Sequence, residues 1–388
     1  MSLNAYPLAW ATADAMRAAA RRWQRRGLLT PAQQVAINAA YPSPYYRPNV
    51  WIRILLLILT VLGIAAALGF SVLITEGKLP PTAYDVLVVV GAVVLLELTI
   101  KGSSHYRSGA DNALLYIALV AWGFLANEIS EQLATSSTVT TCSLLLLLPV
   151  LLAALVRYAD PLVAAASFSA ALALLANVLL QSTLGRQLLP FGAMAAAGGL
   201  LLALRQLPNR TDYFYYRSAG LVLRTLGLAA LYLAGNYLVV REGNAQLLGG
   251  GGPSGQIPLA PLFYACTAGM PVVYIGLGLR RHDRLLLTLG LLALAFSLFT
   301  LRYYRSLLPP EIAATVGGAV LLLGSLAALR YLRTPRHGLT AAADEEAASH
   351  FNLETLVVAQ TAHAPAAPEV GFEFGGGHSG GSGAEGRY

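Results

Sequence analysis

The sequence predicts an all-α fold, a polytopic transmembrane helix bundle of about ten helices. Of its 388 residues, 56% are hydrophobic and only 12% are charged, whereas soluble domains average about 25% charged residues. Apolar runs near the ~20 residues that cross a bilayer recur from Ile52 to Leu332. Backbone groups in lipid must be satisfied internally, and the runs lack the alternation of barrel strands, so helices are required.

Ten segments are expected to span the membrane, each separated from the next by a short polar break. The count depends most on the third and ninth segments, because losing either would reverse the topology of everything that follows. The expected spans are 54–75, 82–100, 112–129, 138–156, 161–180, 187–204, 218–240, 257–279, 285–301 and 310–331.

Cations collect at one end of this predicted bundle. With the N-terminus in the cytoplasm, the inside regions hold 19 Lys and Arg residues and the outside loops hold 5. The positive-inside rule therefore predicts a multi-pass protein of the bacterial inner (cytoplasmic) membrane with both termini cytoplasmic. The net charge of +7 follows from this placement, so nucleic acid is not an expected partner. Every second segment ends on a cation: Lys101, Arg157, Arg205, Arg280 and Arg330.

The chain divides into three predicted parts. Residues 1–50 form a small cytoplasmic helical N-terminal unit, residues 51–333 form the transmembrane helix bundle, and residues 334–388 form a cytoplasmic tail. The tail ends in a Gly-rich stretch and is expected to be largely disordered. A run of glycines makes 241–256 a flexible external loop.

The N-terminal unit contains clear start and stop signals for two helices. The first helix is expected over 8–26, and Gly27 suits its end because glycine accepts positive φ. The second begins with a capping box, in which Thr30 is the N-cap and Gln33 the third helical residue. It ends before Tyr41, because the proline that follows disfavours helix.

This unit also carries a family resemblance. Trp23 and Gly27 precede Leu28-Leu29-Thr30 and Gln33, and a long apolar run follows a proline-containing break. The pattern resembles a bacterial multi-pass membrane protein family of unknown function that has a short helical N-terminal unit. The resemblance covers roughly residues 15–130 and implies no catalytic residue. The family often has Asn-Trp after its first membrane helix, where this sequence has Thr75-Glu76-Gly77.

Few polar residues fall inside the predicted spans, and those that do are the candidate intramembrane site residues, because polar groups in lipid are costly. Glu97 is followed four residues later by Lys101, so an interfacial ion pair is favoured over a buried functional carboxylate. Asn177 and Asn236 are expected to form hydrogen bonds between helices. The candidates are Arg224, Glu97, Asn177 and Asn236.

Arg224 leaves two alternatives open. Only sixteen residues separate it from the end of its segment, which is about 24 Å of helix and short for a full span. Either its charge lies inside the hydrocarbon and needs a partner, or its long stem carries the charge to the headgroups. We favour the second alternative, because the stem can cover one or two turns of depth.

The sequence contains no motif for catalysis or cofactor binding. All six histidines lie in predicted loops or tails, and both cysteines lie in apolar segments without metal-ligand spacing. We therefore expect no enzyme, no cofactor and no metal, and a non-enzymatic membrane scaffold or sensor. The alternative is a transporter or channel for a small or lipidic substrate. The expected partners are the lipid bilayer and either another membrane protein or a second copy of the chain.

Overall fold

The computed structural model of the protein describes residues 4–247, 257 and 259–304, with single helical positions between 312 and 330. Contacts between residues divide the chain into two units, Met1–Ala313 and Ala314–Tyr388. Within the described residues, all regular structure is helical apart from an isolated bridge between Tyr46 and His105.

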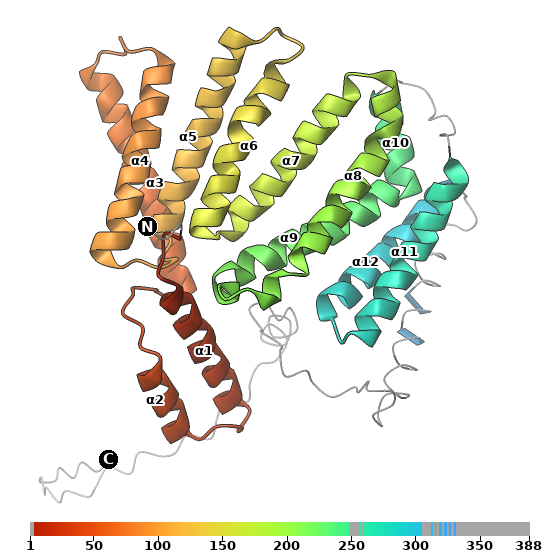
Figure 1. Ribbon diagram of the computed structural model, residues 1–388, viewed down its shortest axis with the longest axis horizontal. Coiled ribbons are helices and arrows are strands. Elements are labelled where there is room, and N and C mark those ends of the chain that lie inside the picture. The colour runs from red at the N-terminus through yellow and green to blue at the C-terminus, as the bar shows by residue number, and fades with distance from the viewer. Residues whose placement is uncertain are drawn as a thin grey trace, which may run out of the picture. The chain divides into compact units, whose positions relative to one another are not determined.

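Most of the helices follow one another with short connections (Figure 1). Two of them belong to the N-terminal unit, and the others form the apolar bundle. In chain order they are α1 (Leu8–Arg25), α2 (Pro31–Ala40), α3 (Val50–Ile74), α4 (Pro81–Ser103), α5 (Ala110–Leu133), α6 (Val139–Tyr158), α7 (Pro161–Leu180), α8 (Thr183–Leu204), a 3-10 turn (Leu207–Asn209), α9 (Tyr213–Gly235), α10 (Tyr237–Leu247), α11 (Ala260–Arg280) and α12 (Arg284–Tyr304).

In this part of the chain, nine helices are long and apolar enough to cross a membrane. They confirm the prediction of a polytopic helix bundle, and the protein is a multi-pass membrane protein. The third and ninth expected spans, on which the count depended, are formed by α5 and α12. The tenth expected span, 310–331, lies mostly outside the described residues, as do the glycine run at 248–256 and the tail at 334–388.

The expected span 218–240 is wrong in its bounds. The helix starts earlier, at Tyr213, and ends at Gly235, after which Asn236 takes an extended conformation with ψ of 126°. A separate helix, α10, begins directly afterwards and also occupies the first part of the region expected to be an external loop. Hydropathy did not indicate this break, because the residues on both sides of it are apolar.

Consecutive helices from α4 to α9 pack on one another, and α11 packs on α12. The short turns after α4, α6, α8 and α11 lie at the lower ends of the helices as drawn in Figure 1. We call this the arginine-rich end, because Arg107, Arg157, Arg205 and Arg280 lie in or beside these turns. The other ends of the same helices form the opposite end.

The N-terminal unit has the expected pair of helices. Gly27 has φ of 72° after α1, and Thr30 and Gln33 form the complete capping box of α2. The Gln33 N–H donates to Thr30 Oγ1 at 3.3 Å, and the Thr30 N–H donates to Gln33 Oε1 at 2.9 Å. The sequence therefore predicted both the start of α2 and the atoms that stabilise it.

Candidate functional site

The four candidate polar residues lie in four separate contacts. Asn177 accepts a hydrogen bond from the Thr141 hydroxyl at 2.6 Å, which joins α7 to α6 as the sequence predicted. Glu97 pairs with Arg157, Arg224 pairs with Asp283, and Asn236 is fully buried elsewhere. These residues do not line one polar cavity, which transport through a shared polar site would require.

Asn236 lies at the break between α9 and α10 and connects three helices. Its Oδ1 accepts the Leu238 N–H at 3.0 Å and so caps α10. Its Nδ2 donates to the Tyr232 hydroxyl at 3.0 Å and to Thr300 Oγ1 at 3.3 Å. Ser297 continues the network by donating to the Thr267 carbonyl at 2.6 Å. Both the donor and the acceptor of the Asn236 amide are used within the protein, so this buried cluster acts as a structural junction.

Arg224 reaches the turn between α11 and α12, where its guanidinium pairs with the Asp283 carboxylate. The Arg224 side chain is 42% exposed and that of Asp283 is 15% exposed. Asp283 also accepts the Leu286 N–H at 3.3 Å, at the start of α12. The long stem thus carries the charge to the arginine-rich end and also finds a carboxylate there, which combines parts of both sequence-based alternatives.

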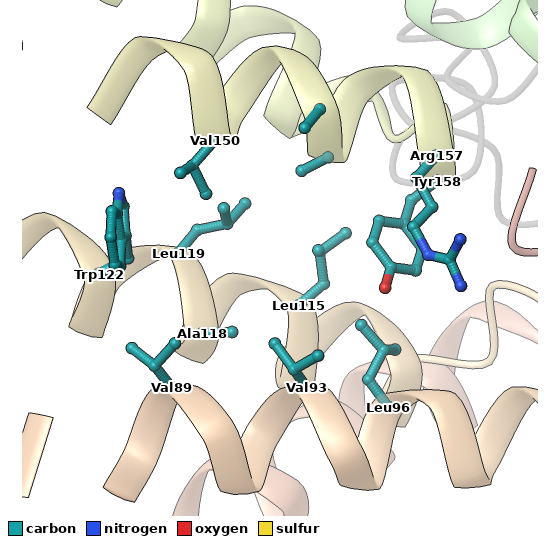
Figure 2. Close-up of a pocket in the computed structure, with 12 residues that line it drawn as sticks. Val89, Val93, Leu96, Leu115, Ala118, Leu119, Trp122, Val150, Arg157 and Tyr158 are labelled. Atoms are coloured by element: carbon teal, nitrogen blue, oxygen red, sulfur yellow. The ribbon is translucent and has the colours of Figure 1, made fainter. Parts of the chain in front are cut away.

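An apolar groove, which we call the α4–α6 groove, lies between α4, α5 and α6, and its lining residue Arg157 pairs with the candidate Glu97. The volume of the groove is about 200 Å³. Figure 2 shows Val93 and Leu96 from one side, Leu115 and Leu119 along the middle, and Trp122 near one end. Aliphatic walls of this kind suit a hydrocarbon chain rather than a polar solute.

Arg157 and Tyr158 mark the other end of the α4–α6 groove (Figure 2). Arg157 donates to Glu97 Oε1 from Nε at 2.9 Å and from Nη2 at 2.6 Å. The Tyr158 hydroxyl donates to the same oxygen at 2.9 Å, and Lys101 Nζ lies 3.2 Å from Glu97 Oε2. The expected Glu97–Lys101 pair is present, but the sequence did not indicate that Arg157 joins it.

The electrostatics of this end favour an anion. Two cations, Arg157 and Lys101, share one carboxylate, so the cluster keeps an excess positive charge. The Arg157 side chain is 37% exposed and that of Lys101 is 69% exposed, so neither cation is fully enclosed by the bundle. Arginine forks and lysine ammonium groups are the usual protein ligands of phosphate and carboxylate groups.

The backbone of Arg157 forms a hydrogen bond with the N-terminal segment. Its carbonyl, at the C-terminal end of α6, accepts the Ala5 N–H at 2.9 Å and also the Tyr215 hydroxyl of α9. Carbonyls in the last turn of a helix have no partner within the helix and must be satisfied from outside. Residue Arg157 therefore contacts the groove and α4 with its side chain, and the N-terminal segment and α9 with its backbone.

A buried carboxylate fixes the same N-terminal segment. Asp111 is fully buried and accepts the backbone N–H groups of Arg107 at 2.7 Å and Ser108 at 2.8 Å. The Tyr6 hydroxyl donates to Asp111 Oδ2 at 2.7 Å. Gly109, with φ of 102°, completes the turn, and a Cβ there would lie 2.2 Å from the Arg53 carbonyl oxygen.

These surroundings shift the pKa of the Tyr6 hydroxyl. Burial, and next the negative charge of Asp111, raise the pKa of Tyr6 well above its ordinary value. Its ring makes an edge contact with Tyr106, with centroids 5.1 Å apart, and Trp10 and Tyr45 complete the aromatic cluster. The sequence did not indicate Tyr6 or Asp111, because the two residues lie 105 residues apart and only the tertiary fold brings them together.

No family model matches the chain, and neither the curated proteins nor the solved structures include a significant match. Across the residues that the structure describes, no three His, Cys, Asp or Glu side chains gather as they would around a metal ion. An apolar groove with a cationic end is suited to bind an amphiphile with an anionic head, and Arg157 connects that groove to the N-terminal unit.

Proposed function

We propose that this multi-pass membrane protein is a non-enzymatic sensor of an anionic amphiphile in its own bilayer. The hydrocarbon chain of the ligand lies in the α4–α6 groove, and its head contacts Arg157 and Lys101. The N-terminal helical unit changes its conformation when the ligand changes the position of Arg157. The proposal extends the sensor hypothesis and includes a lipidic ligand, one of the two substrate classes that the transporter alternative named.

The observation that supports the proposal is the double attachment of Arg157. Its guanidinium makes two hydrogen bonds to Glu97 on α4 at the groove end, while its carbonyl accepts the Ala5 N–H at 2.9 Å. A ligand that draws the guanidinium away from Glu97 acts on the residue to which the N-terminal segment is bound. A conformational response requires such a difference in contacts between the free and bound states.

The location follows from the charge distribution of the sequence. We place the arginine-rich end at the cytoplasmic face of a bacterial inner membrane, with both termini in the cytoplasm, as the positive-inside rule predicts. The cytoplasmic leaflet carries anionic lipid headgroups that attract basic groups near the surface. The cationic end of the α4–α6 groove then lies at the level of those headgroups.

The test compares lipid binding by native mass spectrometry of the detergent-purified protein. Phosphatidylglycerol and phosphatidylcholine with identical acyl chains are titrated in parallel, so only the headgroup differs. We expect the protein to prefer phosphatidylglycerol, and Arg157→Gln to lower that preference about tenfold, because one charge-assisted contact is worth roughly 1.5–3 kcal/mol.

Arg205→Gln is the matched control. Arg205 is an exposed cation at the same end but does not line the groove, so its loss lowers the general positive potential equally. The preference should survive in this variant. Equal binding of both lipids by the unaltered protein, or equal effects of the two substitutions, would contradict the proposal.

A further inference from the structure

A second groove, independent of the proposed function, lies between α3 and α4 with α5 as its floor. We call it the α3–α4 groove. Both walls pack on α5 but scarcely on each other, so a space of about 350 Å³ remains between them. Leu57 and Tyr116 lie toward its arginine-rich end, and Leu68 and Phe124 lie toward its opposite end. About 16 Å of helix separates Leu57 from Leu68.

One acidic residue lines this otherwise apolar groove. Asp85 lies on α4, about 6 Å along the helix from its start at Pro81. That is beyond the first turn, in which the helix dipole would stabilise a carboxylate. Asp85 has no hydrogen bond or ion pair within the described part of the chain. A carboxylate on a membrane-spanning helix is costly, and such residues ordinarily mark a functional contact.

The other carboxylates of the described spans and their connecting turns show how unusual Asp85 is. Glu97 pairs with two cations, Asp111 accepts backbone N–H groups, and Asp283 pairs with Arg224. Asp160 accepts hydrogen bonds from Asn112 at 2.8 Å and from two backbone N–H groups. Asp85 therefore differs from these four carboxylates, each of which has a partner inside the protein.

Glu128 is a second acidic residue toward this end of the bundle, although it does not line the groove. Glu128 lies on α5 one turn beyond the groove residue Phe124, and its Oε2 is buried without a hydrogen-bond partner. The cation closest in sequence, Lys78, is exposed in the preceding turn and already pairs with Glu76. This end of the groove therefore complements a positively charged group, in contrast to the cationic end of the α4–α6 groove.

The groove also opens sideways to the bilayer. Val61 and Phe124 on its rim are 40% and 63% exposed, and exposed apolar side chains of a membrane span face lipid. An occupant can therefore enter laterally, with its hydrocarbon chain along α5 and its head near the end of the span. The bilayer's own phospholipids have this form and are present at high local concentration.

We infer that the α3–α4 groove binds a phospholipid with a primary ammonium headgroup, whose ammonium contacts Asp85. Carboxylate oxygens are strong hydrogen-bond acceptors, and a primary ammonium offers three N–H donors whereas a choline headgroup offers none. Charge-assisted hydrogen bonds are about twice as strong as neutral ones. Recognition through Asp85 therefore discriminates phosphatidylethanolamine from phosphatidylcholine.

The experiment measures binding of these two lipids, with identical acyl chains, to the full-length protein by native mass spectrometry. We expect about a tenfold preference for phosphatidylethanolamine, since one charge-assisted hydrogen bond is worth about a factor of ten or more. Asp85→Asn should reduce the ratio to about one while phosphatidylcholine binding stays unchanged. Asp85→Glu should keep a measurable preference, because it retains the carboxylate.

Glu131→Gln is the control. Glu131 lies near the end of α5 that is away from the arginine-rich end, as Asp85 does on α4, but it does not line the groove. This substitution should leave the preference intact. If Asp85→Asn does not yield folded protein, Val120→Trp fills the groove from its exposed rim and should lower binding of both lipids equally. Equal binding of the two lipids by the unaltered protein, or a preference that Asp85→Asn and Val120→Trp both leave intact, overturns the inference.

Discussion

At the scale of single residues, the place where a long side chain ends decides which partner its charge finds. Arg224 lies eleven residues along α9, yet its guanidinium pairs with Asp283 in the turn before α12. From the sequence, the flexibility of the stem was evident, but its partner was not. The partner is fixed by which helices pack together, and hydropathy contains no information about that.

The Arg224–Asp283 pair provides a stability prediction. Arg224→Leu should lower the free energy of unfolding by about 1 kcal/mol, the upper value for a partly exposed ion pair, and Arg224→Lys should lower it less. In protein that already carries Asp283→Asn, the change at Arg224 should cost clearly less, because the pair no longer exists. Thermal unfolding in detergent measures the unaltered protein, the three single variants and the double variant. Equal losses in both backgrounds would show that the pair contributes nothing.

Tyr6 provides a prediction of pH dependence. Because burial and Asp111 raise its pKa in the folded protein, the folded state holds the hydroxyl proton more tightly than the unfolded state. Its contribution to docking is fully present below its ordinary pKa of about 10 and decreases as the pH rises above that value. The protection of α1 against hydrogen exchange, relative to the intrinsic exchange rate at each pH, should therefore fall as the pH rises above about 10. Tyr6→Phe should remove this loss of protection, and an unchanged pH profile of protection in that variant would contradict the assignment.

At the scale of elements, the same turn is built twice. Arg157-Tyr158-Ala159-Asp160 joins α6 to α7, and Arg280-Arg281-His282-Asp283 joins α11 to α12. The residue before each aspartate has positive φ, 47° at Ala159 and 53° at His282. The Asp160 side chain then accepts two backbone N–H groups of the next helix, and the Asp283 side chain accepts the N–H of Leu286. The sequence showed the repeated arginine at these helix ends, and the structure adds the aspartate that starts the following helix.

The capping box of α2 gives a prediction at this scale. Thr30→Ala removes the oxygen that accepts the Gln33 N–H, so α2 should lose about 1 kcal/mol of stability. Hydrogen exchange at residues 32–36 of the full-length protein should accelerate, and Thr30→Ser should restore slow exchange because it keeps the hydroxyl. Unchanged protection in Thr30→Ala would mean that packing, and not the cap, holds this helix.

The helices themselves could largely be predicted, and the break at Asn236 could not. Length and hydropathy identify a span because both are sums over about twenty residues. A break depends on one side chain that replaces lost backbone hydrogen bonds, as Asn236 does by accepting the Leu238 N–H. The sequence predicted only part of the ion cluster at the end of the α4–α6 groove. The pair of Glu97 with Lys101 could be predicted because the two residues are four positions apart, but Arg157 lies 60 residues from Glu97.

At the scale of the whole molecule, the distribution of cations predicts the topology. Both termini should be cytoplasmic, and the glycine-rich segment after α10 should be outside. Reporter fusions at Gly251 and Ser349 should therefore report opposite sides of the membrane, with Ser349 in the cytoplasm. Signals from the same side would contradict the arrangement of ten spans with both termini inside.

The proposed sensor requires that Arg157 transmit occupancy of the α4–α6 groove to the N-terminal unit. The most direct measurement is hydrogen exchange of α1 in lipid nanodiscs with and without phosphatidylglycerol, for the unaltered protein, Arg157→Gln and Arg205→Gln. We predict that phosphatidylglycerol changes the exchange of α1 in the unaltered protein and in Arg205→Gln but not in Arg157→Gln. A change of equal size in all three proteins, or in none, would contradict the claim.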